Sequence, residues 1–297
     1  MIDFKVPRLR DKILIDTKNW VQNSSGCTLG LHRMSGRPLP TYIAKVLEVN
    51  AHTEELKNAV QKGDTVLLTR VVSDVSMYKS FSTELDNNSY FNVPIMQILG
   101  VFKNGDISIN SLKMLFDKIL VRKIESKSKL ILSNDNTMIG EVVKVGTCRF
   151  DKDWNSSSLT VRAGDKVLIR DNVTTEVYLD GEYYYAVEES MIVSIFTEDK
   201  LKFDESMVIN NNIILEPYIP ESTSIFLTPN LNYEDEDYTE IYNRDLFKVI
   251  RVDSLLTELQ EGDIILVNRN ITNYVYYNEN KYFIISGIEN VEAKIIK

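Results

Sequence analysis

The sequence predicts an all-β protein built from three diverged copies of one unit. The first observation is a Gly-Asp pair followed by a β-type run, which occurs in QKGDTVLLTR (61–70), RAGDKVLIRD (162–171) and QEGDIILVNR (260–269). The three pairs lie about one hundred residues apart, which is the length of a small domain and far too long for a solenoid repeat. The second observation is that short β-branched runs bounded by polar residues dominate the remaining sequence, as is typical of strands.

Each copy opens with two strands separated by a polar loop. The predicted opening strands are 11–16, 117–124 and 211–217, and the predicted second strands are 41–49, 137–145 and 244–252. The Gly-Asp strand follows after a further connection, and its alternating apolar residues predict one face turned toward a barrel or sandwich core.

A hairpin and a closing strand end each copy, over 82–102, 174–196 and 273–295. Asp180-Gly181 between Tyr- and Val-rich runs is a strong signal for a two-residue hairpin turn. Polar, turn-rich segments near 103–108 and 197–205 separate the copies. They predict three domains, at 1–105, 106–200 and 201–297.

Helix is scarce in this pattern. Residues 53–61 and 254–260 have the composition for a turn or two of helix before the Gly-Asp pair. We expect both to be surface connectors.

The Gly-Asp pair itself predicts a structural turn. Glycine permits a positive φ at a tight turn, and aspartate bonds backbone N–H groups two residues further on. We therefore assign these aspartates no catalytic or metal-binding role.

The composition argues against several classes of function. The formal net charge of −9 disfavours a nucleic-acid surface, which needs clustered Lys and Arg. Cys27 and Cys148 give neither metal-ligand spacing nor a disulfide framework, and they fit a reduced compartment. His32 and His52 are the two histidines, and no catalytic triad or phosphate loop is indicated. We expect no enzyme activity, no cofactor and no metal, although the acidic stretch 232–240 is either a solvated loop or a cation site.

The middle copy resembles a known family. The residues that carry the resemblance are DKILVRKI (117–124), GEVVKVG (140–146), RAGDKVLIRD (162–171) and GEYYYAVEESMIVSIF (181–196). In this order and spacing they resemble the bacterial co-chaperonins, the small GroES-type lid proteins of chaperonin rings. The resemblance covers 112–197 well and extends to 7–102 and 207–295 only through the internal repeat. It implies three tandem GroES-like irregular β-barrels.

The resemblance also implies two functional extensions. One is a mobile loop between the first two strands, which carries an apolar tripeptide that docks on the chaperonin. It corresponds here to 125–136, with Leu130, Ile131 and Leu132, and in the third copy to 222–229, with Ile225, Phe226 and Leu227. The first copy matches poorly, with Cys27, Thr28 and Leu29. The other extension is a roof-like hairpin, which corresponds to 146–163.

The apolar tripeptides have two interpretations. In a polar loop they bury apolar surface in a partner's groove, with modest and reversible affinity because the loop orders on binding. Alternatively, each caps its own barrel or a neighbouring one. Trp20 and Trp154 lie in the predicted extensions and are either partner contacts or locally packed residues.

Three departures separate this chain from the family. Family members are single barrels in seven-membered rings, and three barrels per chain do not divide into seven. The paired glycines before the tripeptide are replaced by Ser128-Lys129 and Thr223-Ser224, which predicts a stiffer loop. The outer copies, with connections 50–62 and 253–261, lack a roof hairpin.

These features predict a protein-binding assembly protein, most simply a phage virion component associated with a capsid, because the Asn- and Tyr-rich composition resembles that of phage proteins. The alternative is a working co-chaperonin that caps a chaperonin ring. The expected partners are capsid subunits or a chaperonin ring, within a larger assembly and without nucleic acid or membrane. The N-terminal MIDFKVPRLR has no apolar signal-peptide run, and no stretch approaches 18 apolar residues, so we expect a location in the virion or the host cytoplasm.

Overall fold

The computed structural model describes most of the β-structure of the chain. The described residues are 12–16, 43–51, 53–68, 82–85, 88–124, 130–132, 137–150, 155–170, 175–196, 201, 205–218, 246–267, 274–277 and 280–295. Among them, no helix is long and apolar enough to cross a membrane.

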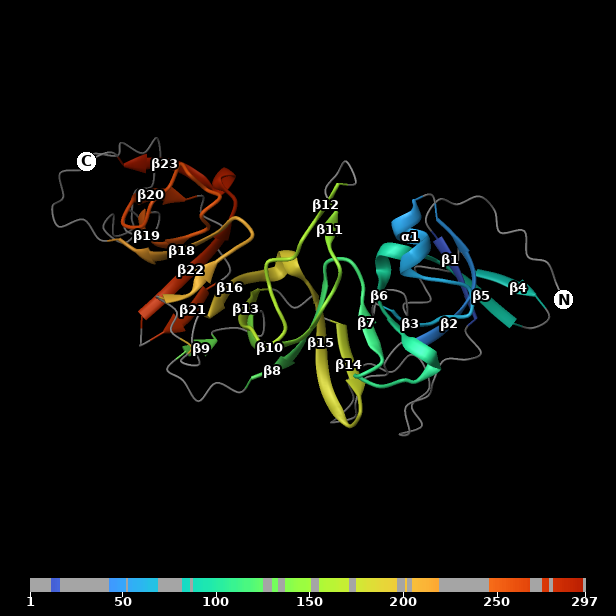
Figure 1. Cartoon of the computed structure of the whole chain (residues 1–297). Helices are drawn as coiled ribbons and strands as arrows, with labels where there is room; N and C mark the ends of the chain where they lie inside the picture. The colour runs from blue at the N-terminus through green and yellow to red at the C-terminus, as the bar shows by residue number, and fades with distance from the viewer. Residues whose placement is uncertain are drawn as a thin grey trace, which may run out of the picture. The chain divides into compact units, whose positions relative to one another are not determined.

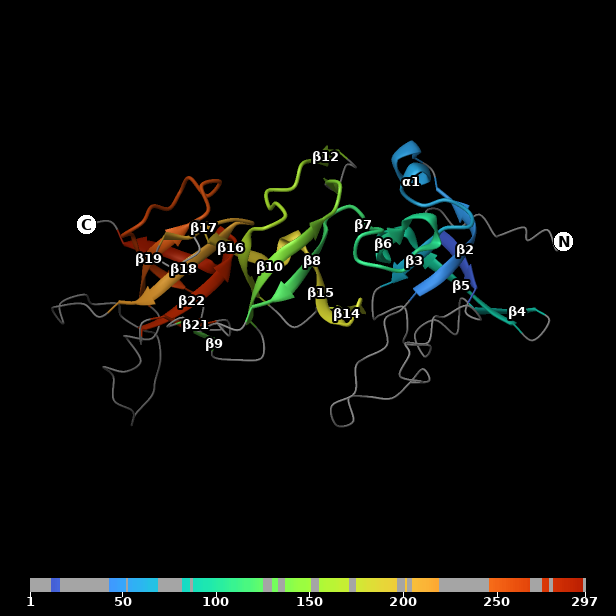
Figure 2. The same cartoon turned by 60° about the horizontal axis from the view of Figure 1, so that its bottom comes forward.

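Among the described residues the chain forms three seven-stranded antiparallel sheets, whose strands are drawn as arrows in Figures 1 and 2, and the prediction of an all-β fold is confirmed. The first sheet has the order β4-β5-β1-β2-β3-β6-β7. Its strands are β1 (Lys12–Asp16), β2 (Ile43–Asn50), β3 (Thr65–Leu68), β4 (Ser82–Leu85), β5 (Asn88–Pro94), β6 (Ile98–Phe102) and β7 (Leu112–Met114).

The second sheet has the order β14-β15-β8-β10-β13-β16-β17. Its strands are β8 (Lys118–Lys123), β10 (Thr137–Val145), β13 (Lys166–Arg170), β14 (Thr175–Leu179), β15 (Glu182–Glu188), β16 (Ile192–Phe196) and β17 (Met207–Val208). A separate pair joins β11 (Arg149–Phe150) to β12 (Ser156–Ser157).

The third sheet has the order β23-β20-β19-β18-β22-β21-β9. Its strands are β9 (Leu130–Leu132), β18 (Asn212–Pro217), β19 (Leu246–Val252), β20 (Ile264–Val267), β21 (Tyr274–Tyr277), β22 (Asn280–Ser286) and β23 (Val291–Ile295). Short 3₁₀ turns precede the closing strands β6, β16 and β23, at Ile95–Gln97, Glu189–Met191 and Ile288–Asn290, and a fourth lies at Lys103–Gly105.

The three sheets share one strand order. Each runs from the two arms of a hairpin through the opening strand, the second strand and the Gly-Asp strand to the closing strand. In the first two sheets the seventh strand, β7 or β17, is added beside the closing strand. In the third sheet the seventh strand is β9, which is added beside the hairpin. The tandem-repeat interpretation of the sequence stays a prediction.

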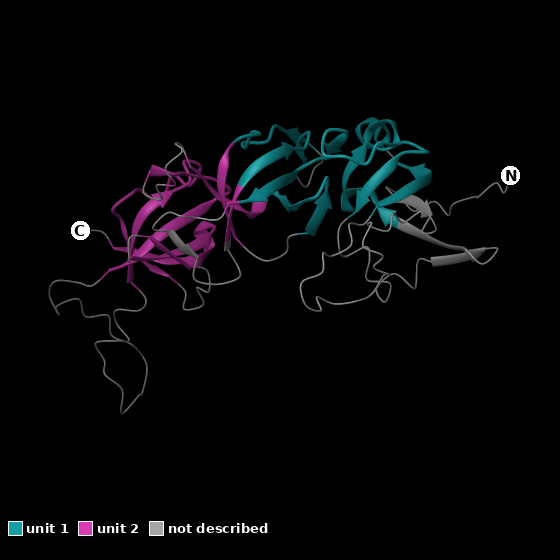
Figure 3. Ribbon diagram, turned by 90° about the horizontal axis from the view of Figure 1, so that it is seen from below, with its two compact units in different colours: residues 1–123, 141–164, 173–189 teal, residues 124–140, 165–172, 190–297 magenta. Residues whose placement is uncertain are grey.

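The chain divides into two compact units (Figure 3). Unit 1 comprises 1–123, 141–164 and 173–189, and unit 2 comprises 124–140, 165–172 and 190–297. Strands of the second sheet therefore belong to both units. The predicted domain boundaries near 105 and 200 do not coincide with this division and stay a prediction.

The short helix α1 (Glu54–Ala59) begins at Thr53, whose hydroxyl oxygen accepts a hydrogen bond from the Leu56 N–H. Leu56 and Val60 are fully buried in the core of the first sheet. The corresponding segment 254–260 forms turns, with Leu256 and Leu259 buried in the core of the third sheet. Both segments connect strands with most of their side chains exposed, as expected, and each also places two apolar side chains under its sheet.

The Gly-Asp turns are alike in all three sheets. Gly63, Gly164 and Gly262 have φ of +92°, +95° and +91°. Each glycine N–H donates to a carbonyl of the second strand, at 2.8, 2.8 and 2.7 Å. This geometry explains the glycine, since other residues rarely adopt a positive φ.

The aspartates of two of these turns bond in an unexpected direction. The carboxylates of Asp64 and Asp263 accept hydrogen bonds of 2.7 Å from the Gln61 and Gln260 N–H groups, three residues earlier rather than two residues later. Each carboxylate thereby closes the turn that leads into its strand. Burial raises the pKa of Asp263, but the hydrogen bonds from Lys294 and Gln260 outweigh it and hold this pKa below its ordinary value.

Two hydrophobic clusters of matching composition join successive sheets; we call them junction cores. The unit 1 junction core packs the β14–β15 hairpin on the first sheet, and the unit 2 junction core packs the β21–β22 hairpin on strands of the second sheet. When corresponding strands of successive sheets are aligned one by one, the same positions contribute to both junction cores. The matched residues are Ile43, Leu67, Leu99, Phe102, Leu120, Val177, Tyr184 and Ala186 in unit 1, and Ile139, Leu168, Val193, Phe196, Ile214, Val275, Tyr282 and Ile284 in unit 2.

Gly146, just after β10, allows a close backbone approach. A Cβ atom at this position would overlap the Phe116 carbonyl oxygen and lie 2.8 Å from the Leu115 carbonyl oxygen. We expect Gly146→Ala to lower the free energy of unfolding by at least about 2 kcal/mol, because both obstacles are backbone atoms that cannot rotate away. Urea denaturation measures this, with Thr147→Ala at the adjacent exposed position as the control. Equal stability of the two variants would contradict the packing described here.

Candidate functional site: the loop strand and the roof hairpin

The predicted docking tripeptide forms a strand. Residues 130–132 constitute β9, which pairs antiparallel with β21 of the third sheet (Figure 1). Leu130 lies opposite Tyr277, Ile131 opposite Tyr276 and Leu132 opposite Val275. The loop between the first two strands of the second sheet therefore extends the third sheet by one strand.

The hairpin that receives β9 is held from both faces. Val275 is fully buried in the unit 2 junction core, together with Tyr282 and Ile284. The Lys281 ammonium group lies 4.0 Å from the centre of the Tyr274 ring and 4.7 Å from that of Phe283. Such cation–π contacts stabilise a side-chain arrangement, so β21 is a well-supported edge.

A hairpin also lies within the segment predicted to form the roof. In β11 and β12, Arg149 pairs with Ser157 and Phe150 with Ser156. Phe150 packs against the core of the first sheet, and its ring centre lies 5.8 Å from that of Phe116. The base of the roof hairpin is therefore fixed within unit 1.

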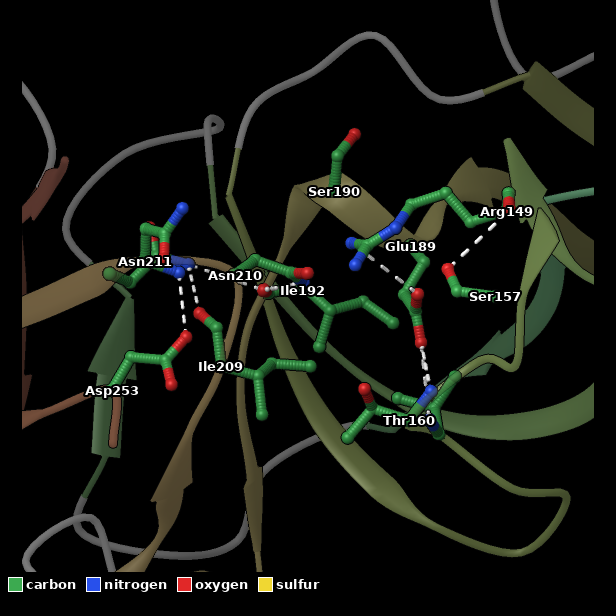
Figure 4. A network of polar contacts seen from close by, with 12 residues as sticks. Arg149, Ser157, Thr160, Glu189, Ser190, Ile192, Ile209, Asn210, Asn211 and Asp253 are labelled. Atoms are coloured by element: carbon green, nitrogen blue, oxygen red, sulfur yellow. Dashed lines mark hydrogen bonds and ion pairs between the residues drawn. The ribbon is translucent and has the colours of Figure 1, made fainter. Parts of the chain in front are cut away.

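A buried carboxylate ties down the chain that returns from this hairpin (Figure 4). Glu189 is fully buried, and its Oε1 accepts hydrogen bonds from the Thr160 and Val161 N–H groups. The Arg149 guanidinium lies 3.8 Å from Oε2. A buried carboxylate requires this kind of compensation, because removing its charge from water is costly. The sequence did not indicate that Glu189 is buried, because it lies beside another acidic residue in a segment that looks like an ordinary exposed turn.

A second polar network, in unit 2, shapes the turn before β18 (Figure 4). Asn210 and Asn211 have positive φ, which asparagine tolerates better than most residues. The buried Asn212 donates its amide to the carbonyls of Ile209, at 2.7 Å, and Ile192, at 3.3 Å. The Asp253 carboxylate accepts the Asn211 N–H at 2.7 Å. The contacts are structural, and they fix the start of the third sheet.

Several predicted site residues lie outside the described residues: Trp20, Trp154, Ile225, Phe226 and Leu227, together with Cys27, Thr28, Leu29 and the acidic stretch 232–240. Their partner-binding or cation-binding roles stay predictions. Within the part of the chain that the structure describes, no group of three or more His, Cys, Asp or Glu residues could hold a metal ion.

The geometry defines a class of β-barrel protein with a loop after its first strand and a roof hairpin before its Gly-Asp strand.

Comparisons with known proteins identify the family. The model of the chaperonin 10 kDa subunit family matches residues 111–196. The co-chaperonin GroES of Hydrogenobaculum sp. (strain Y04AAS1) is 35% identical over 92 residues, which are 28% of this chain and 96% of the relative. That of Lawsonia intracellularis is 33% identical over 94 residues, 29% of this chain and 93% of the relative. That of Jannaschia sp. (strain CCS1) is 36% identical over 94 residues, 29% of this chain and 99% of the relative.

The chain belongs to the GroES-type co-chaperonin family, and the resemblance drawn from the sequence is confirmed. The family model matches 111–196, and the matches to these relatives cover nearly their whole length but less than a third of this chain. The loop 125–136 and the hairpin 146–163 both lie inside the matched segment.

Proposed function

We propose that this protein is a co-chaperonin-type binding protein that docks on a chaperonin-like ring through the loop 125–136. The observation that carries the proposal is that the segment 111–196 matches the family model, and that a match over 92 residues covers 96% of a relative named a co-chaperonin. Within that segment the chain keeps both a loop with an apolar tripeptide and a hairpin in the roof position. On this proposal the protein assists the folding of other proteins by binding the ring, and it catalyses no chemical step.

The docking residues in this proposal are Leu130, Ile131 and Leu132, with Ile225, Phe226 and Leu227 as a second, homologous set. Burial of three apolar side chains in a partner's groove supplies the driving force, about 25 cal/mol per Å² of apolar surface removed from water. The cost of ordering the loop offsets part of this gain and keeps binding reversible. Trp20 and Trp154 are proposed as additional contacts with the partner.

A second candidate function is that of a structural component of a virion, associated with capsid subunits. The observation that favours it is the buried junction core in each unit, which joins barrels that single-barrel relatives carry as separate chains. A three-barrel chain does not fit a seven-membered ring, whereas it fits a particle of other symmetry. On this proposal the protein resides in the virion, and on the first it acts in the host cytoplasm.

Retention on an immobilised bacterial chaperonin ring in the presence of ATP tests the proposal. We expect saturable binding of the full chain, with a loss of at least about tenfold in affinity for Ile131→Asp and for Phe226→Asp, because a buried unpaired carboxylate is strongly unfavourable. Ser133→Asp adds the same charge beside the tripeptide and serves as the matched control. No retention of the wild-type chain, combined with its presence at high copy number in purified particles by mass spectrometry, would favour the virion component instead.

A further inference from the structure

We propose that the outer edge of β21 is a strand-docking surface whose occupant in the free protein is the segment 130–132, so that β9 must leave β21 before the tripeptide can bind a ring partner. This inference rests on the proposed function, because it concerns the availability of the same tripeptide. The inference adds a competition to the proposed function: the edge of the third sheet and the ring partner compete for the same tripeptide.

The strand orders show that this edge is a special position. In the first and second sheets, the outer hairpin arms β4 and β14 are the last strands of their sheets among the described residues. In the third sheet, the corresponding arm β21 is followed by β9. The addition comes from a segment more than one hundred residues away in sequence, and thus it is not a continuation of the hairpin.

Backbone chemistry explains why an extended apolar segment fits there. An edge strand presents a row of N–H and C=O groups that lack a partner within their own sheet. An extended segment that adds alongside satisfies these groups, and this mode of recognition recurs in peptide binding. The Leu-Ile-Leu segment is apolar, with the β-branched Ile131 at its centre, and it has no proline or glycine that would interrupt the pairing.

The edge remains in place when its occupant leaves. Val275 is anchored in the unit 2 junction core, and the opposite face of the hairpin is braced by Lys281 over Tyr274 and Phe283. The pairing of β21 with β22 covers Tyr274–Tyr277 on its inner side. The docking surface is therefore preorganised by contacts that do not involve β9.

Short tethers keep the occupant close. Six residues (124–129) connect β8 to β9, and four residues (133–136) connect β9 to β10. Even fully extended, six residues span only about 20 Å. A tether this short gives the segment a high effective concentration at β21, so a ladder of only three residue pairs is enough to hold it. The same tethers prevent the segment from staying on β21 while it inserts into a groove of another protein.

A disulfide placed across this pairing tests the proposal directly. Residues directly opposite on antiparallel strands have Cα atoms about 4.5–5.5 Å apart, which lies within the range that a disulfide bridges. In a Cys27→Ser, Cys148→Ser background, we expect Ile131→Cys with Tyr276→Cys to form an intramolecular disulfide in the absence of any partner. The oxidised chain should bind the chaperonin ring at least about tenfold more weakly than the reduced chain, and a reductant should restore binding.

The controls separate this inference from the proposed function. The single variant Ile131→Cys in the same background reports any effect of the substitution itself on ring binding. If both cysteines react with a maleimide but form no disulfide under oxidising conditions, the docking of 130–132 on β21 is wrong, whether or not the ring binds. If the disulfide forms but the reduced chain does not bind the ring, the proposed function fails and the β9–β21 pairing stands. Equal ring binding by oxidised and reduced chains would overturn the competition.

A variant that weakens the edge gives the opposite effect. We expect Tyr276→Gly to bind the ring more tightly than the wild type, by up to roughly fivefold, because glycine lowers the strand propensity of the acceptor without changing the tripeptide. Unchanged or weaker binding by Tyr276→Gly, with the third sheet intact by circular dichroism, would contradict the inference.

Discussion

Val275→Asp is expected to lower the free energy of unfolding of unit 2 by about 4 kcal/mol or more. Val275 is fully buried and packs with Ile139, Leu168 and Ile284 in the unit 2 junction core. An aspartate there would bury a carboxylate among apolar side chains, and removing its charge from water is costly. Denaturant titration measures the loss of unfolding free energy. Hydrogen exchange of individual segments, measured along the titration, shows which unit loses stability.

The matched variant for this prediction is Val177→Asp, at the corresponding position of the unit 1 junction core. We expect a loss of similar size that appears in unit 1 segments such as β3 and β6. Val275→Ala should cost less than Val275→Asp, about 2 kcal/mol, since it removes apolar volume without introducing charge. If Val275→Asp raised the hydrogen-exchange rates equally in all segments, the destabilisation would not be confined to unit 2. That result would contradict the assignment of this core to one compact unit.

Glu189→Ala is expected to lower the free energy of unfolding by roughly 3 kcal/mol and to release the return segment of the roof hairpin. The substitution leaves the Thr160 and Val161 N–H groups without their acceptor, and buried donors that lose a charged partner are costly. The exchange rates of the Thr160 and Val161 amides report the local effect, and urea denaturation reports the global one.

Two further variants show which atoms of Glu189 matter. Glu189→Gln keeps an oxygen that accepts the two N–H groups and loses mainly the contact with Arg149, whose side chain is 44% exposed. We expect it to cost less than half as much as the alanine variant, because partly exposed ion pairs contribute little. Ser190→Ala, at the neighbouring exposed position, is the control. Equal losses for Glu189→Gln and Glu189→Ala would assign the stabilisation to the ion pair instead.

Local sequence signals predicted the repeating elements of this fold well. Asp180-Gly181 predicted a two-residue hairpin, and the structure has positive φ at both residues, with Leu179 paired to Glu182 across the turn. The glycines of the Gly-Asp pairs predicted positive φ, and all three have it. These features depend on the conformations of one or two residues, which is the information that a short stretch of sequence carries.

The features that sequence reasoning missed depend on contacts between distant segments. No short stretch of sequence indicates that residues 130–132 pair with 275–277. Such a pairing depends on which sheet edge lies near the segment once the chain has folded. From its sequence neighbours alone, Glu189 would be assigned to an exposed turn. It is buried because the segment with Thr160 and Val161 folds over it. In the segment 53–61 the buried apolar residues are Leu56, within α1, and Val60, at its extended C-terminal cap. Helix periodicity alone does not account for both, because Val60 lies outside the helix.

The two junction cores have a consequence for the order in which the chain folds during synthesis. The unit 1 junction core draws its residues from Ile43 to Ala186, and the unit 2 junction core draws its residues from Ile139 to Ile284. Neither core is complete until the hairpin at its C-terminal end has left the ribosome. Unit 1 therefore completes its core about one hundred residues of synthesis before unit 2 does.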